Sequence, residues 1–162
     1  MARKESRFNT EIKNSIVAAG GWAHKLPDPP RGGGGEGRTF TTKRPCDLVY
    51  FFRNNGGVIE SKFQRGFKAF GGRLAEHQIE TLNQVVATGN EAWVFLNIYV
   101  PRETNRLLAF PWPDNRLVEG PSYKKQELID YPYHVECEKG LFDIARVLEE
   151  YIVFENWEGY YD

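Results

Sequence analysis

Apolar residues recur along the chain with two different periods, which predict alternating helices and strands. Within residues 7–19, Phe8, Ile12 and Ile16 recur at helical spacing, and Gly20-Gly21 ends the pattern. The same criterion predicts a second amphipathic helix over 74–86, a short helix near 123–129 and a longer one across 140–152.

Runs of apolar residues too short for helices predict five strands, at 22–26, 46–52, 57–63, 92–100 and 106–112. The sequence "RNNGG" between the second and third runs contains the Asn and Gly that tight hairpin turns favour. No internal repeat interrupts this order of elements. Helices interspersed with strands, with one hairpin over 46–63 and a second over 92–112, predict an α/β fold, with a mixed central β-sheet flanked by helices.

One segment, residues 27–45, contains too many prolines and glycines for regular structure. Its sequence, "PDPPRGGGGEGRTFTTKRP", predicts a flexible basic loop. A loop of this length inside a compact domain is uncommon and is usually functional or a linker. We therefore interpret the chain as one domain over 1–162 with this loop inserted.

The composition is that of a soluble protein, at 41% hydrophobic and 27% charged residues among 162. No apolar run reaches the roughly 18 residues that a membrane span needs, and the N-terminus lacks the apolar core of a secretory signal. Cys46 and Cys137 have no metal-ligand spacing and are interpreted as reduced thiols. The expected location is the cytoplasm, of a bacterium or of a cell infected by a virus.

The charge is distributed unevenly between the two halves of the chain. Residues 1–73 contain 14 Lys and Arg against 6 Asp and Glu, a balance of +8, and residues 74–162 have a balance of −9. This asymmetry favours a polyanionic partner for the first half. A basic face that is merely solvated is the alternative.

The predicted hairpin places three charged residues together. Side chains alternate between the faces of a strand, so Glu60 and Lys62 share one face. Asp47 joins that face, opposite Glu60 if the turn is centred on Arg53-Asn54, or opposite Lys62 if it is centred one residue later. The dipeptide Asn55-Gly56 favours a third register that separates Asp47 from Glu60, and we therefore expect a longer or bulged turn.

Two carboxylates and a lysine on one strand surface have a definite chemical use. Hard oxygen ligands bind Mg²⁺, for which Mn²⁺ can substitute, and this ion prefers one or two carboxylates plus substrate phosphate. The metal would lower the pKa of a bound water, and the lysine would orient that water or stabilise charge in the transition state. With a basic surface beside it, this set predicts phosphodiester hydrolysis.

Two simpler interpretations compete with this prediction. An exposed hairpin face with a cross-strand Asp–Lys salt bridge would give the same short pattern. The literal "PD" dipeptides, Pro27-Asp28 and Pro113-Asp114, could supply the aspartate instead, but hairpin geometry places neither of them beside Glu60. Asp47 is therefore the preferred partner.

At these residues the sequence resembles the PD-(D/E)xK nuclease superfamily, and within it the Holliday junction resolvases of the RecU type, with the Hjc type more distant. The similarity covers residues 7 to 100 and lies in "PCDLVYFF…GVIESKFQ", in "EHQIETL" at 76–82 and in "FNTEIKNSI" at 8–16. It implies a restriction-endonuclease-like fold. Cys46 replaces a more usual apolar residue, and the family's protruding stalk has no clear counterpart inserted in this hairpin.

The resemblance also implies roles for individual residues. Asp47 and Glu60 would hold the metal, Lys62 would position or activate the attacking water, and Glu11 would be a further ligand through water or cap a basic patch. Gln78 would contact the metal-bound water or the DNA backbone. Phosphate contacts would come from basic residues, namely Arg31, Arg38, Lys43, Arg44, Arg53, Arg65, Lys68, Arg73 and His77.

The function implied is that of a homodimeric, Mg²⁺-dependent endodeoxyribonuclease that makes paired, symmetric nicks in branched double-stranded DNA at a four-way junction. A repair, nicking or restriction-like nuclease of the same superfamily, acting on duplex DNA, is one alternative. A DNA-binding module without catalytic activity is another. Phe67 and Phe70 could stack on unpaired bases at the junction, although packing in the core is the simpler role.

Overall fold

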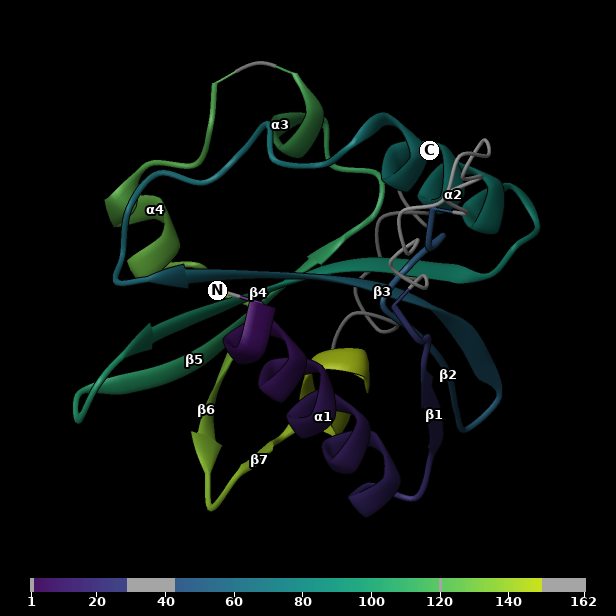
Figure 1. The fold of residues 1–162 in the computed structure, drawn as a ribbon, viewed down its shortest axis with the longest axis horizontal. Helices are drawn as coiled ribbons and strands as arrows, with labels where there is room; N and C mark the ends of the chain where they lie inside the picture. The colour runs from purple at the N-terminus through teal and green to yellow at the C-terminus, as the bar shows by residue number, and fades with distance from the viewer. Residues whose placement is uncertain (1, 29–42, 120, 150–162) are drawn as a thin grey trace, which may run out of the picture.

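The computed structural model of the protein describes residues 2–28, 43–119 and 121–149. These residues form a sheet of seven strands with helices on both faces (Figure 1). The helices are α1 (Ala2–Ala18), α2 (Glu76–Ala87), α3 (Asn115–Val118) and α4 (Lys125–Ile129), and residues 144–149 are also helical. The strands are β1 (Trp22–Lys25), β2 (Leu48–Phe52), β3 (Asn55–Arg65), β4 (Glu91–Val100), β5 (Thr104–Pro111), β6 (His134–Glu138) and β7 (Leu141–Phe142).

The sheet follows the order of the chain, from β1 at one edge to β7 at the other. All neighbouring strands are antiparallel except β3 and β4, which run parallel. A parallel pair needs a crossover connection, and α2 supplies it. The mixed α/β architecture expected from the order of the apolar runs is therefore confirmed.

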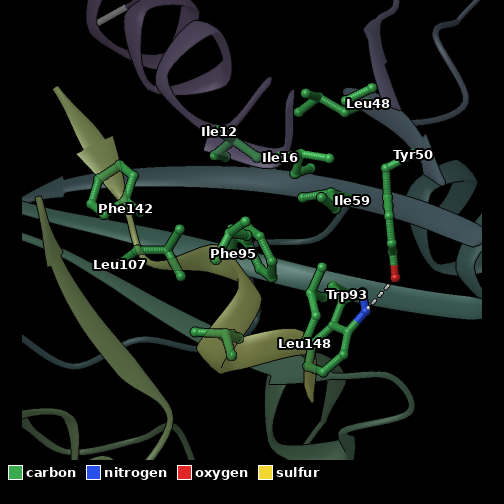
Figure 2. Close-up of a cluster of buried hydrophobic side chains, with 14 of the residues drawn as sticks. Ile12, Ile16, Leu48, Tyr50, Ile59, Trp93, Phe95, Leu107, Phe142 and Leu148 are labelled. Carbon is green, nitrogen blue, oxygen red and sulfur yellow. Dashed lines mark hydrogen bonds between the residues drawn. The ribbon is translucent and has the colours of Figure 1, made fainter. Parts of the chain in front are cut away.

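One face of the sheet is covered by α1 and by the helical residues 144–149. Ile12 and Ile16 of α1 pack there against Leu48 and Ile59, and Leu148 lies in the same cluster (Figure 2). Tyr50 is buried in this layer, where its hydroxyl accepts a hydrogen bond from Trp93 Nε1 at 2.9 Å and donates one to Glu91. Packing in this layer fixes the position of β2 and β3.

The opposite face is covered by α2, α3 and α4 (Figure 1). Leu82 of α2, Leu117 of α3 and Leu128 of α4 are buried against Val94 and Phe110 of the central strands. Val58 belongs to this second cluster and Ile59 to the first, as the alternation of side chains along a strand requires. Glu60 and Lys62 therefore belong to the face that carries α2.

Most of the predicted elements are found with shifted ends, but the C-terminal part differs. The structure confirms the short helix near 123–129 as α4, although α3 was not predicted. The helix expected across 140–152 is wrong at its start, because Leu141 and Phe142 form β7 and helical structure begins at Ile144. Phe142 is held in this strand by a hydrogen bond from its N–H to Ser15 Oγ at 2.9 Å.

Parts of two other predictions lie outside the described residues. They are the glycine-rich segment of the basic loop, residues 29–42, and the end of the C-terminal helix beyond 149. Within the three described ranges, no helix combines the length and the apolar character that a membrane crossing requires. Cys46 and Cys137 are both free, as expected from their spacing.

Candidate active site

The β2–β3 hairpin turns at Arg53-Asn54, with Phe52 paired to Asn55 and Leu48 paired to Ile59. This is the register that places Asp47 opposite Glu60. The longer or bulged turn that we expected is wrong: two residues suffice, and Arg53 adopts a positive φ of 53°. Gly56 lies in β3 and not in the turn. It is required there because a Cβ would lie 2.7 Å from the ring of Phe51.

Asp47 lies just before β2 and is almost completely buried, with 1% of its surface exposed. Its Oδ2 accepts a hydrogen bond from the backbone N–H of Ser61 at 2.7 Å. Its Oδ1 accepts one from Arg44 Nη2. The backbone of the neighbouring strand therefore fixes the direction in which this carboxylate points.

Glu60 is the centre of a second group of contacts, and only 3% of its surface is exposed. Its Oε1 accepts hydrogen bonds from Lys62 Nζ at 3.1 Å and from Gln78 Nε2. Gln78 also accepts bonds at Oε1 from Lys62 Nζ at 3.2 Å and from the N–H of Ala75 at 2.9 Å. The first turn of α2 thus connects three of the predicted site residues.

Burial and charge change the ionisation of this site. Burial, followed by the charge of Asp47, raises the pKa of Glu60 to about 8, although the ammonium of Lys62 opposes the shift. Burial also raises the pKa of the Cys46 thiol to about 12, with the charges of Glu60 and Asp47 adding to the effect. The thiol of Cys46 is therefore protonated. The positive charges of Lys62 and Arg44 only partly offset the burial of Glu60 and its repulsion by Asp47.

Glu11, the carboxylate predicted from the first helix, is not brought to this group. Its Oε1 accepts a hydrogen bond from Arg7 Nε at 3.0 Å, and it lines a separate pocket of about 90 Å³ with Asn97 and Tyr99. The carboxyl group of α1 that lies near the site is Glu5. Burial raises the pKa of Glu5, as does the charge of Asp47, while Lys62, Arg44 and Arg73 lower it.

Glu5 was missed because the predicted helix began at residue 7. In the structure α1 begins at Ala2, and Glu5 continues the buried stripe of Phe8, Ile12 and Ile16 by one more turn. The sequence signal that could have identified Glu5 is a carboxylate at helical spacing from these apolar residues. Glu5 and Glu11 are six residues apart, about 9 Å along a helix axis, so both cannot serve one site.

The carboxylates of this group are donors of the kind that a divalent ion prefers. Within the described ranges, no three His, Cys, Asp or Glu side chains surround a common point. Mg²⁺ nevertheless needs only one or two carboxylates when waters and a phosphate complete its shell. Asp47 and Glu60 meet that requirement, and Glu60 Oε2 accepts no hydrogen bond from the described residues. The residues therefore fit Mg²⁺ or Mn²⁺.

The predicted phosphate-binding residues fall into three groups. Lys43, Arg65 and Lys68 are exposed, and no residue of the described ranges pairs with them. Arg53 pairs with Glu149 at 2.5 Å, Arg73 donates to the carbonyl of Phe63 at 3.2 Å, and Arg44 is paired with carboxylates. His77 is half-buried on α2, and Arg31 and Arg38 lie outside the described residues.

The competing aspartates and the two phenylalanines have other roles in the structure. Asp28 pairs with Arg44 at 2.7 Å. Asp114 caps α3, where it accepts a hydrogen bond from the N–H of Arg116 at 2.9 Å. Phe70 is buried against Phe110, with ring centroids 5.6 Å apart, and Phe67 is half-buried under the guanidinium of Arg106. Core packing therefore accounts for Phe70.

Comparison with known proteins finds similarity among solved structures. No family model matches the chain, and no curated protein matches it. Among solved structures, the fold is similar to that of Hjc from Archaeoglobus fulgidus, described as a Holliday junction resolvase from an archaeal hyperthermophile. The TM-score is 0.47 and the identity 22%, over 81% of this chain and 94% of that chain. The likeness concerns the α/β fold alone.

Proposed function

We propose that this protein is a metal-dependent endodeoxyribonuclease that resolves four-way DNA junctions by paired nicks. The observation that carries the proposal is the hairpin register, which sets the buried carboxylate of Asp47, just before β2, opposite that of Glu60 on β3. Lys62 is bonded to Glu60 at 3.1 Å. An exposed Asp–Lys salt bridge does not account for this set, because Lys62 pairs with Glu60 and both carboxylates are buried.

Mg²⁺ or Mn²⁺ would be held by Asp47 and Glu60, with Glu5 close enough for its charge to act on the same space. When bound, the ion would supply charge stabilisation at the scissile phosphate and a water with a lowered pKa. This chemistry would take place at the end of the hairpin away from its turn, where Asp47 and Glu60 lie. Since Glu60 is buried with Asp47, a cation between them would also relieve their mutual repulsion.

Lys62 and Gln78 would prepare the site for the reaction. The side chain of Lys62 is 13% exposed, and its ammonium is held by Glu60 and Gln78. There it can orient an attacking water, or donate to an oxygen on which negative charge develops in the transition state. Gln78 holds Lys62 and Glu60 in one arrangement through the two ends of its amide.

The four-way junction is proposed as the substrate because the sequence resembles the RecU-type resolvases. Symmetric nicks in two strands need two active sites, so the working form would be a homodimer inside the cell. Exposed Lys43, Arg65 and Lys68 would contact phosphates without reading base sequence. Recognition would therefore depend on the shape of the junction.

The test is an assay of wild type and Glu60→Gln on a labelled four-way junction and on a linear duplex of the same sequence. Wild type is expected to nick the junction at symmetric positions when Mg²⁺ is present and to leave the duplex intact. Glu60→Gln is expected to abolish cleavage while binding the junction in Ca²⁺ nearly as wild type does. Glu76→Gln, an exposed glutamate on α2, is the matched control and should cleave normally.

Three outcomes would contradict the proposal in different ways. Loss of junction binding together with cleavage in Glu60→Gln would assign a structural role to Glu60. Equal cleavage of duplex and junction would favour a duplex nuclease. Binding without cleavage by wild type at any Mg²⁺ or Mn²⁺ concentration would favour a DNA-binding module without catalysis.

A further inference from the structure

The two carboxylates of the site are not equally open to an ion. Both oxygens of Asp47 are bonded, Oδ1 to Arg44 Nη2 and Oδ2 to the N–H of Ser61. Glu60 is bonded only through Oε1, so its Oε2 is open among the described residues. An ion that binds both carboxylates would therefore approach an Asp47 oxygen that already accepts a hydrogen bond.

Arg44 is the donor that can leave. The N–H of Ser61 belongs to the backbone of β3, in the middle of the sheet, and Ser61 is fully buried. Arg44 donates from a long side chain that precedes β2, and 23% of that side chain is exposed. Its guanidinium and a divalent ion that approached Oδ1 would repel each other in this buried space, so the ion competes with Arg44 for Asp47.

Arg44 has a second anchor that is already at the surface. Its Nη1 donates to Asp28 Oδ1 at 2.7 Å and to the carbonyl of Leu26 at 3.4 Å, and Asp28 is 81% exposed. A guanidinium bonded to an exposed carboxylate can be withdrawn from Asp47 without becoming buried and unpaired. The planar fork that binds two carboxylates also matches the oxygens of a phosphate.

We propose that Arg44 occupies the ion's place on Asp47 in the resting protein, is displaced when the divalent ion binds, and then binds a phosphate of the DNA. This inference rests on the proposed function, from which it takes both the ion and the DNA. It gives Arg44 two successive partners. It also explains why a residue expected to bind phosphate is paired with two carboxylates here.

A thermodynamic coupling follows from this exchange. While Arg44 holds Asp47, the ion-binding form is only a fraction of the population, and the apparent affinity for the ion falls by that fraction. Binding of the ion frees Arg44 for the DNA, and binding of DNA to Arg44 opens Asp47 for the ion. Each ligand therefore raises the affinity of the other by the same factor.

The first measurement is Mn²⁺ binding by calorimetry, without DNA, to the full chain. Arg44→Gln is expected to bind Mn²⁺ about tenfold more tightly than wild type, since the competitor is removed. Arg102→Gln is the matched control, because it removes an exposed arginine in the β4–β5 turn, and it should bind as wild type does. Equal affinities of Arg44→Gln and Arg102→Gln would overturn the proposal.

Arg44→Lys keeps the charge and is the second variant to measure if Arg44→Gln misfolds. Circular dichroism would detect such misfolding. A single ammonium cannot bridge Asp28 and Asp47 as the fork does, so its Mn²⁺ affinity should lie between those of wild type and Arg44→Gln. If Arg44→Gln fails to fold, an affinity of Arg44→Lys equal to or weaker than that of wild type would overturn the proposal.

The second measurement is the salt dependence of junction binding, with Ca²⁺ and with EDTA. For wild type, Ca²⁺ should steepen the slope of log K against log salt by about 0.9, as one more phosphate is neutralised. Arg44→Gln should show no change in slope on adding Ca²⁺. An equal change in both proteins would show that Arg44 is not the group released.

The proposed function can fail separately from this inference. A wild type that neither binds Mn²⁺ nor cleaves the junction would refute the proposed function. A wild type that does both, while Arg44→Gln has unchanged Mn²⁺ affinity, would refute only the exchange of partners by Arg44.

Discussion

Gln78 lies where the residues of the site meet. One amide group donates to Glu60 and accepts from Lys62, and its carbonyl oxygen also accepts the N–H of Ala75 at the start of α2. The side chain thus positions the two residues that would act directly on the ion and the water. Removing it leaves Glu60 with one donor instead of two.

Gln78→Ala is therefore expected to lower the rate of junction cleavage by about 10–100-fold, the usual effect of losing a residue that orients a metal ligand. The rate should also need a higher pH to reach its maximum, because Glu60 loses a hydrogen bond that favours its ionised form. Gln84→Ala, exposed on the same helix, is the control. An unchanged pH profile together with reduced thermal stability would mean that Gln78 supports only the helix.

The raised pKa of Glu60 predicts how stability depends on pH in the absence of metal. Between its ordinary pKa near 4.5 and its folded pKa of about 8, the folded protein holds a proton that the unfolded chain has released. The free energy of unfolding should therefore fall as the pH rises through this window, and level off above it. The burial of Glu5 contributes in the same direction.

Urea unfolding in EDTA at several values between about pH 5 and pH 8 measures this slope. Glu60→Gln, which cannot ionise, should flatten it, and Glu76→Gln on the surface of α2 should leave it as in wild type. A slope that is the same in wild type and Glu60→Gln would mean that Glu60 is already ionised in the folded protein.

At the level of elements, Ser15 ties α1 to the far end of the sheet. Its hydroxyl donates to the carbonyl of Glu11 at 2.6 Å and accepts the N–H of Phe142 at 2.9 Å. Since Phe142 packs against Phe8 with ring centroids 5.8 Å apart, this bond and that contact hold β7 against α1.

Ser15→Ala should lower the free energy of unfolding by about 1–3 kcal/mol, because the buried N–H of Phe142 loses its acceptor. Thr10→Ala is the matched control, since Thr10 donates to the carbonyl of Ser6 four residues back but faces solvent. Chemical unfolding compares the two variants. Equal losses of unfolding free energy in the two variants would indicate that the hydrogen bond from Phe142 to Ser15 does not stabilise the fold.

These contacts show which parts of the fold were accessible from the sequence. The hairpin was predictable because β2 and β3 are adjacent in the chain and their side chains alternate. β7 was not, since Leu141, Ile144, Val147 and Leu148 also suit one long helix. The long-range bond to Ser15 decides that Phe142 is in a strand, and no local pattern contains it.

The same distinction applies to the site. Alternation predicted that Asp47, Glu60 and Lys62 share one face of the hairpin, although the register was left open and the turn was expected to be longer than it is. Glu5 and the contacts of Gln78 depend on how α1 and α2 pack on the sheet, which spacing along the chain does not determine. Arg44 was expected to be free for phosphate, and its pairing with Asp28 and Asp47 could not be inferred from a loop of unknown path.

For the whole molecule, the basic first half of the chain supplies the hairpin, and three cations of that half are exposed without partners in the described ranges: Lys43, Arg65 and Lys68. A DNA phosphate that approached the buried carboxylates of Asp47 and Glu60 would be repelled by them, and a divalent cation between them would make the approach favourable. Ion and substrate are thus expected to bind together.

The most direct measurement is the anomalous scattering of Mn²⁺ in crystals of the protein bound to a four-way junction. A manganese peak is expected within roughly 2.5 Å of an oxygen of Asp47 and of an oxygen of Glu60, with a DNA phosphate beside it. Manganese bound elsewhere, or a junction bound with no ion between these two carboxylates, would contradict it.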